Sequence, residues 1–194
     1  NPDGSEQHVI YGVPVDLTES ERFDPTPWEI YTYDANDNAG RTHAADPGAK
    51  AYEHHWNTPA SATIDALGRT VETIMRNREK RPNSAAPLPP IEEYRTTSTY
   101  DIRSNLLVVT DPLGRAAFTH TYDLANRPLR IVSIDAGDRH TALDAAGNIL
   151  ETWDSKGART LHAYDELNRP THLWACDEAG ELRTLRERLI YSQN

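Results

Sequence analysis

Short segments with the character of β-strands recur through most of the chain. Phe118–Tyr122 alternates aromatic and polar residues, and Asn105–Thr110 and Leu129–Ile134 are rich in Leu, Val and Ile. Such segments are typical of strands that pack one face of a sheet. Leu182–Ile190 leaves a helix open as an alternative, although it lacks helix-capping residues. The pattern therefore predicts an all-β chain made of consecutive antiparallel hairpins.

Aspartates mark the boundaries between these segments. A series of aspartates recurs at intervals of 9 to 12 residues, the spacing expected of short strands joined by turns. The series is Asp101, Asp111, Asp123, Asp135, Asp144, Asp154, Asp165 and Asp177. Eight aspartates are followed, three positions later, by Gly or Asn. The eight pairs are Asp37 and Gly40, Asp65 and Gly68, Asp111 and Gly114, Asp123 and Asn126, Asp144 and Gly147, Asp154 and Gly157, Asp165 and Asn168, and Asp177 and Gly180.

Turn chemistry explains why these residue types stand at this spacing. Asp is favoured at the first position of a type I turn, where its carboxylate accepts hydrogen bonds from backbone N–H groups. The fourth residue must adopt a left-handed conformation to begin the returning strand through a bulge, and Gly and Asn tolerate this conformation best. We therefore predict that all sixteen residues are structural turn residues at the ends of hairpins.

The spacing of the aspartates also suggests a domain organisation. Residues 31–194 are predicted to form the repeating β-sheet segment, with loop insertions near 46–61 and 78–93, where prolines interrupt the pattern. Residues 1–30 are polar, contain four prolines and lack a clear period. We predict that they form an extended arm or a linker.

Tyrosines precede several of the turn aspartates, and this combination resembles a known family. Tyr33–Asp34, Tyr100–Asp101, Tyr122–Asp123 and Tyr164–Asp165, with Gly-Arg or Asn-Arg steps after most of the turns, resemble the repeats of the RHS/YD-repeat family. Within that family, Tyr31–His43 and Asn57–Arg69 are similar to the B component of bacterial insecticidal toxin complexes.

The resemblance implies a function as well as a fold. In that family the hairpins wind in a spiral into a curved, hollow β-shell, which the B and C components close around a toxic polypeptide. The implied partners are the remainder of the RHS shell and the C component, the encapsulated toxin and, indirectly, the pore-forming A component. The expected role is a secreted structural shell segment that encapsulates and protects a toxic polypeptide before translocation.

Composition narrows the other possibilities. The net charge of -10 and a pI of about 5.2 argue against binding to the phosphate backbone of a nucleic acid. No apolar run is long enough to span a bilayer, and the single cysteine, Cys176, rules out a disulfide within the chain. We therefore expect no nucleic-acid partner and no membrane span.

No catalytic residue, metal site or cofactor is predicted. Glu53–His54–His55 is the tightest histidine cluster and Asp34–Asn38 the most oxygen-rich stretch, but we favour a solvated loop and a turn over metal binding. One alternative function is an adhesion or carbohydrate-binding β-module. Another is an enzyme with a carboxylate pair. Candidate sugar-binding residues of the β-module are Trp28, Trp56, Trp153 and Trp174.

Overall fold

The structure is a computed structural model that describes residues 4–45, 55–79 and 87–192. The chain forms two compact units. The first comprises residues 1–98 with 111–113, and the second comprises residues 99–110 with 114–194. In both units, each strand pairs antiparallel with the strand that precedes or follows it in the sequence.

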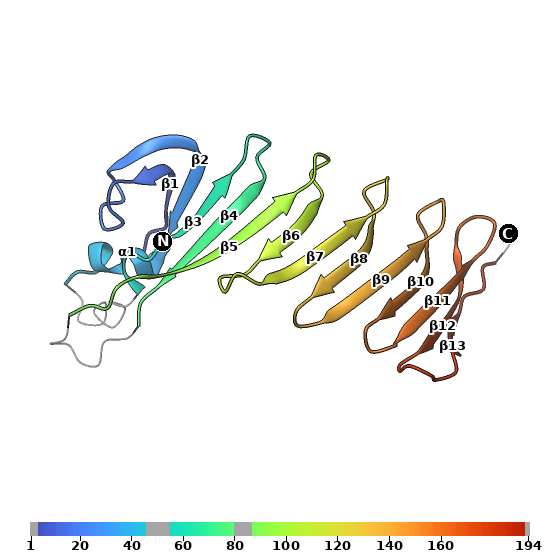
Figure 1. Ribbon diagram of the computed structural model, residues 1–194. Helices are drawn as coiled ribbons and strands as arrows, with labels where there is room; N and C mark the ends of the chain where they lie inside the picture. The colour runs from blue at the N-terminus through green and yellow to red at the C-terminus, as the bar shows by residue number, and fades with distance from the viewer. Residues whose placement is uncertain (1–3, 46–54, 80–86, 193–194) are drawn as a thin grey trace. The chain divides into compact units, whose positions relative to one another are not determined.

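The first unit is an antiparallel meander with one helical insertion (Figure 1). The helix lies in the connection between the second and third strands. Its elements are β1 (His8–Pro14), β2 (Phe23–Tyr33), α1 (Ala35–Thr42), β3 (Ala60–Ile64), β4 (Thr70–Asn77) and β5 (Glu92–Tyr100). Most of β5 lies inside this unit.

The second unit continues the same plan without a helix in its described residues. Its strands are short, and they are joined by tight turns (Figure 1). They are β6 (Leu106–Thr110), β7 (Ala116–Tyr122), β8 (Pro128–Ser133), β9 (Gly137–Leu143), β10 (Ile149–Asp154), β11 (Arg159–Tyr164), β12 (Pro170–Cys176) and β13 (Thr184–Arg188).

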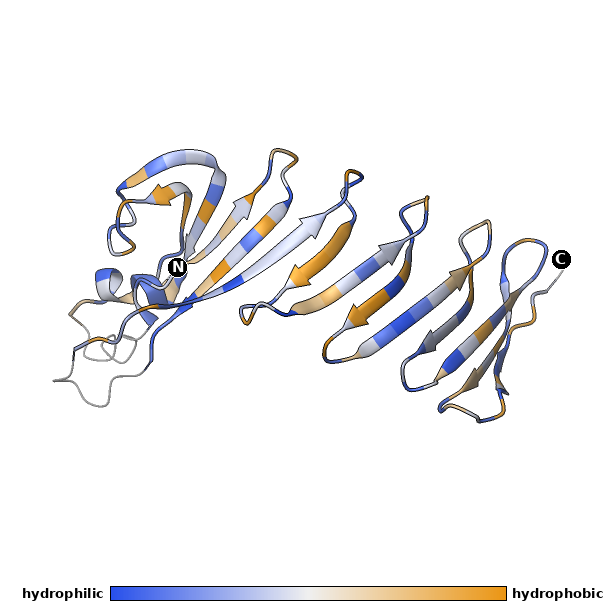
Figure 2. Ribbon diagram, in the orientation of Figure 1, coloured by the Kyte–Doolittle hydropathy of each residue, from blue (hydrophilic) through white to orange (hydrophobic). Residues whose placement is uncertain are grey.

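The predicted fold class, all-β with consecutive antiparallel hairpins, is confirmed. The segment for which a helix was the alternative contains strand β13 instead. Apolar and polar residues are interspersed along the strands, with β6 almost wholly apolar (Figure 2), and most strand residues are half-buried. The buried apolar cluster of the first unit contains Ile10, Tyr31 and Tyr33, with Leu17 packed against it. Much of the order in both units therefore comes from strand pairing and turns rather than from a thick core.

The prediction that residues 1–30 form an arm or a linker is wrong. Strand β1 pairs with β2 along its whole length, and Ile10, which is 1% exposed, lies opposite Tyr31. Two prolines, Pro25 and Pro27, obscured the strand pattern in the sequence. The sheet tolerates them because β3 pairs with β2 only from Glu29 onward, so the ladder on that side loses no hydrogen bond.

The two predicted loop insertions are described only in part, because residues 46–54 and 80–86 lie outside the described residues. Both predicted boundaries extend too far toward the C-terminus. Ala60 and Ser61 already belong to β3, and Glu92 and Glu93 already belong to β5.

Candidate functional surface

The hairpin turn at Asp65 shows how one carboxylate organises five residues. The N–H of Gly68 donates to the Asp65 carbonyl oxygen at 2.9 Å, and the N–H of Asp65 donates to the carbonyl of Arg69 at 2.9 Å. Asp65 Oδ1 accepts from the N–H groups of Leu67 at 2.9 Å and Arg69 at 3.0 Å. Oδ2 accepts from Arg69 Nε at 2.7 Å. Both carboxylate oxygens of Asp65 are therefore held by hydrogen bonds from within the turn.

The same arrangement recurs at other hairpin ends. Oδ1 of each turn aspartate accepts an N–H from the residue two positions later or four positions later, and in most turns from both. The aspartates are Asp101, Asp111, Asp123, Asp144, Asp154 and Asp165. The residue at the fourth position has a positive φ in every one of these turns. These residues are Gly68, Ser104, Gly114, Asn126, Gly147, Gly157 and Asn168.

Hydrogen bonds from the fifth residue hold the pKa of several turn carboxyls below the usual range. At Asp65, Asp101 and Asp144 the largest cause is the side chain of the fifth residue. At Asp123 and Asp165 the largest cause is the backbone N–H of the fifth residue. These carboxylates are ionised and committed to their turns, which makes them poor candidates for a general acid.

The turn after β12 departs from this pattern. Gly180 has a φ of +87°, as predicted for its type, but the carboxylate that organises the loop is that of Glu181. Glu181 Oε2 accepts from the N–H of Asp177 at 3.0 Å and of Glu178 at 3.2 Å. Asp177 instead pairs with Arg186 at 2.8 Å.

The assignment of Asp37 and Gly40 to a hairpin turn is wrong, because both residues lie in helix α1. Asp34 is the N-cap, and its Oδ1 accepts from the N–H groups of Asn36 at 2.7 Å and Asp37 at 2.9 Å. Asp37 Oδ2 in turn accepts from the Asp34 N–H at 2.8 Å, which completes a reciprocal capping box. Two aspartates three residues apart therefore begin a helix here.

Asp37 also fastens the helix to the segment that leads into β3. Its Oδ1 accepts from the N–H of Thr58 at 2.8 Å and from the Thr58 hydroxyl at 3.0 Å. Arg41 donates to Asn57 Oδ1 and to the Thr18 carbonyl, at 2.5 and 2.8 Å. Burial raises the pKa of Asp37, against the lowering effect of its backbone hydrogen bonds. Within the oxygen-rich stretch Asp34–Asn38, the carboxylates of Asp34 and Asp37 therefore accept hydrogen bonds from N–H and O–H donors.

Side chains at the fifth turn position connect neighbouring hairpin ends along one edge of the second unit. Asn105 Nδ2 donates to its own Asp101 at 2.8 Å and to Asn126 Oδ1 of the next turn at 2.9 Å. Asn148 repeats this with Asn168 Oδ1 at 3.1 Å. The turns that begin at Asp123 and Asp165 have arginine at the same position.

Arginine makes the equivalent connection to a turn that has glycine at its fourth position. Arg127 Nη1 donates to the Asp144 carbonyl at 3.3 Å, and a Cβ on Gly147 would lie 3.1 Å from the same nitrogen. Arg169 lies over the Tyr191 ring, 4.3 Å from its centroid. Asn and Arg therefore alternate at the fifth position along this edge, each with its own kind of partner.

The opposite edge of the second unit is packed by small residues. A Cβ on Gly157 would lie 2.7 Å from the backbone nitrogen and Cα of Ala179. A Cβ on Gly137 would collide with the hydroxyl of Ser155, whose N–H donates to the Asp138 carbonyl at 2.9 Å. Glycine is thus required on this edge for close approach of the turns as well as for backbone conformation.

The four tryptophans differ in their surroundings. Trp153 stacks on His140 with ring centroids 4.9 Å apart, and Trp174 stacks on His172 at 5.1 Å. Trp28 is 48% exposed on β2, whereas the Trp56 Nε1 is buried without a hydrogen-bond partner. Two of the four candidate sugar-binding rings therefore already have one face covered by a histidine.

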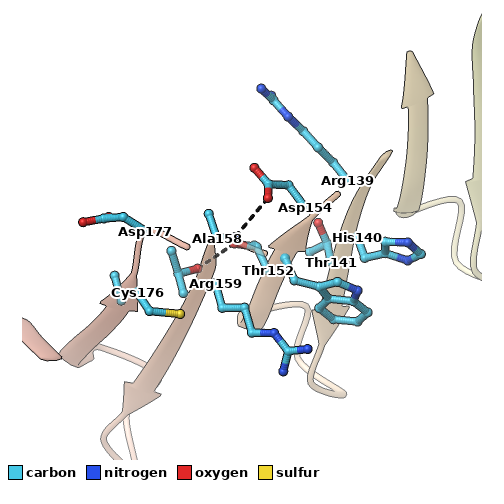
Figure 3. A pocket seen from close by; sticks show the side chains of 12 residues that line it. Arg139, His140, Thr141, Thr152, Asp154, Ala158, Arg159, Cys176 and Asp177 are labelled. Carbon is cyan, nitrogen blue, oxygen red and sulfur yellow. Dashed lines mark hydrogen bonds between the residues drawn. The ribbon is translucent and has the colours of Figure 1, made fainter. Parts of the chain in front are cut away.

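An open pocket of about 410 Å³ lies beside Trp153 in the second unit (Figure 3). Arg139 and Arg159 line it, and the hydroxyls of Thr152 and Thr160 are hydrogen-bonded at 2.6 Å within it. Asp154, which also lines it, accepts the N–H of Ala158 in its own turn at 3.0 Å. Asp177 is the second carboxylate of the lining, and it pairs with Arg186 at 2.8 Å. Both carboxylates of the pocket therefore already have hydrogen-bonding partners.

Two further searches cover only the part of the chain that the structure describes. No group of three or more His, Cys, Asp or Glu side chains is arranged there to hold a metal ion. Glu53 and His54 of the predicted loop cluster lie outside the described residues. No helix among the described residues has the length and apolar character needed to cross a membrane.

Solved structures with a similar fold are toxin-complex components. The crystal structure of TcdB2–TccC3 without its hypervariable C-terminal region matches 86% of this chain, with a TM-score of 0.67 and 25% sequence identity. The Photorhabdus luminescens Tc holotoxin pore matches 88% of the chain, with a TM-score of 0.68 and 25% identity. The resemblance to the RHS/YD-repeat family is confirmed.

The match to RHS/YD-repeat structures extends through most of this chain but only a small part of theirs. The chain covers 8% of the length of each of these toxin-complex chains. No protein-family model and no curated protein matches the sequence. The structural likeness therefore supports a fragment of shell-like RHS fold that resembles the B–C toxin component.

Proposed function

We propose that this chain is a segment of a toxin-complex shell wall that encloses a toxic polypeptide and protects it before translocation. The observation that carries the proposal is the match of 86% of the chain to TcdB2–TccC3, a toxin component with a hypervariable C-terminal region. The proposed partners are the rest of the shell with its C component, the enclosed polypeptide and, indirectly, the pore-forming A component. The proposed location is outside the bacterial cell.

The role is mechanical, and we propose that the chain is not an enzyme. The turn carboxylates that recur through the sheet are held by their own backbone N–H groups, as in the Asp65 turn. In a wall built this way, the turn carboxylates and the backbone N–H groups of the same hairpin are paired with each other. The hairpin ends can then face water or cargo without presenting unpaired polar groups. Such a surface suits weak retention of a cargo that must later leave.

A segment exchange tests the proposal. The matching segment of TcdB2 is replaced by this chain, the chimera is assembled with TccC3, and protease resistance of the hypervariable region is measured. We expect the region to be as resistant as in unmodified TcdB2–TccC3. A matched chimera with Gly157→Val, which blocks the close approach to Ala179, should lose this protection. A folded wild-type chimera whose enclosed region is digested as quickly as the free polypeptide would contradict the proposal.

The pocket beside Trp153 favours one alternative, a carbohydrate-binding module. Its aromatic ring, two arginines and threonine hydroxyls are groups that bind sugars. A glycan array gives the test. Binding that is lost in Trp153→Ala and kept in Trp28→Ala would favour the module over the wall.

A further inference from the structure

The ends of four hairpins line up along one edge of the second unit. They are the turns that begin at Asp101, Asp123, Asp144 and Asp165, between β5 and β6, β7 and β8, β9 and β10, and β11 and β12 (Figure 1). Because strands lie about 4.8 Å apart, successive turns on this edge lie about 10 Å apart and the row is about 30 Å long. The side-chain bonds from Asn105, Arg127 and Asn148 hold these turns in register.

The second and third residues of each turn form the crest of this edge, which we call the tip row. Ile102 is 95% exposed, Leu124 is 89% exposed and Leu167 is 71% exposed. Ala125, Ala145 and Ala146 are exposed as well. Each of the four turns therefore presents at least one exposed apolar side chain on this edge.

The only two charged residues of the tip row stand at its opposite ends and have opposite signs. Arg103 is in the first turn, and its Nη1 reaches the second turn to donate to the Leu124 carbonyl at 2.6 Å. Glu166 is in the last turn, and both residues are exposed. A row with this arrangement is complementary to itself when turned by 180°. This self-complementarity is what a two-fold symmetric interface requires.

The positions within the turns strengthen this match. If a second row faces the first in antiparallel order, the Asp101 turn meets the Asp165 turn of the other copy. The rotation then places Ile102 opposite Leu167 and Arg103 opposite Glu166. In the middle of the row, Leu124 meets the small side chain of Ala146. Apolar residues thus face apolar residues, a large residue faces a small one, and the charges form pairs.

We propose that the tip row is a docking surface for a second copy of the same row in antiparallel register. The two sheets then abut through their hairpin ends, with an apolar centre and an Arg103–Glu166 pair at each end. This mode of association differs from strand addition at a sheet edge, because it uses turns and leaves the backbone ladders untouched. The inference does not depend on the enclosure of a toxin.

Charge reversal gives the sharpest test. Sedimentation velocity of the whole chain at protein concentrations up to about 1 mM should show a monomer–dimer equilibrium, since an interface this small is expected to be weak. Arg103→Glu alone and Glu166→Arg alone should each raise the dimer Kd about tenfold, because each places two like-charge pairs in the interface. The double variant should restore the wild-type Kd to within about threefold.

The apolar centre and a matched control complete the design. Leu124→Glu should raise the Kd at least about tenfold, because it puts a charge where apolar side chains are buried. Lys156→Glu reverses a charge at an exposed turn tip of the opposite edge and should leave the Kd unchanged. All the substituted side chains are exposed, and circular dichroism verifies that each variant is folded.

Three outcomes would overturn the proposal. A wild-type chain that is monomeric at the highest concentration has no such interface. Dimers that are insensitive to Leu124→Glu and to both single charge reversals form through another surface, such as the outer strand β13. Failure of the double reversal to rescue association excludes the antiparallel register.

Discussion

The fourth turn position offers a direct test of what holds each hairpin end. Gly68 has a φ of +75°, and a Cβ built on it meets no atom within 4 Å. Gly68→Ala therefore adds backbone strain without a steric clash. Left-handed strain costs about 1–2 kcal/mol, and the lower entropy of the unfolded chain offsets about 0.4–1 kcal/mol of it. We expect a net loss of about 0.5–1.5 kcal/mol.

Two matched variants separate strain from packing. Gly68→Asn should be close to neutral, because Asn tolerates the left-handed region and occupies the fourth position of two other turns. Gly157→Ala should cost about 1–3 kcal/mol more than Gly68→Ala, because its Cβ would lie 2.7 Å from the Ala179 backbone. Urea denaturation followed by far-ultraviolet circular dichroism measures all three, and the m-value should not change. If Gly68→Ala is as stable as Gly68→Asn, the left-handed requirement is not what selects glycine there.

Three further predictions concern the carboxylates and the lateral bonds. The turn aspartates have lowered pKa values, so they stabilise the fold above their unfolded pKa near 4, and this contribution is lost as the pH falls through the lower folded values. The urea midpoint should therefore drop between about pH 5 and pH 2, and an unchanged midpoint would contradict the turn hydrogen bonds. The raised pKa of Asp37 acts in the opposite sense and should offset a small part of this drop. Asp37→Ala should lower the free energy of unfolding by about 1–3 kcal/mol, because it leaves the donors of Asp34 and Thr58 unpaired. Asp37→Asn should lower it by less, and equal losses for the two variants would show that the acceptor oxygens are unimportant. A double-mutant cycle of Asn105→Ala and Asn126→Ala should give a coupling of about 0.5 kcal/mol, and strictly additive losses would show that the lateral bond contributes nothing.

The hairpins could be predicted because their chemistry is local. An aspartate, a residue able to take a positive φ and the N–H groups between them specify a turn within five residues, as Asp65–Arg69 shows. Ser104 shows the strength of this requirement, since a residue with no special left-handed preference still has a φ of +68° at the fourth position. At this position the backbone conformation that the turn requires outweighs the conformational preference of the serine.

The turn motif of Asp and Gly led to a wrong prediction at Asp37 and Gly40, where a helix-capping signal overlaps it. Asp34 precedes Asp37 by three residues, the spacing of a capping box, and the helix it begins absorbs Gly40. The signal was present in the sequence but competed with the turn pattern. Strand β1 was missed for a different reason. Its pairing partner β2 contains prolines, and the sheet tolerates them because β3 pairs only with the part of β2 that follows them.

The lateral bonds depend on which turns become neighbours, so strand segments alone could not reveal them. Their sequence signal is the residue after the fourth turn position, which reads Asn105, Arg127, Asn148 and Arg169 along one edge. This alternation has meaning only when every second turn is known to lie on the same edge. The stacking of Trp153 on His140 likewise depends on a cross-strand register.

The alternation of Asn and Arg has a consequence for how such a sheet can change its length. An Asn at the fifth position reaches an Asn in the next turn, whereas an Arg reaches past a Gly to a carbonyl. Loss of a single hairpin would bring Asn105 beside Gly147, so its amide would lose the lateral acceptor and keep only its own Asp101. Loss or duplication of two hairpins would keep every donor matched. Four strands, rather than two, are therefore the smallest piece by which this sheet can grow or shrink in evolution without breaking its lateral bonds.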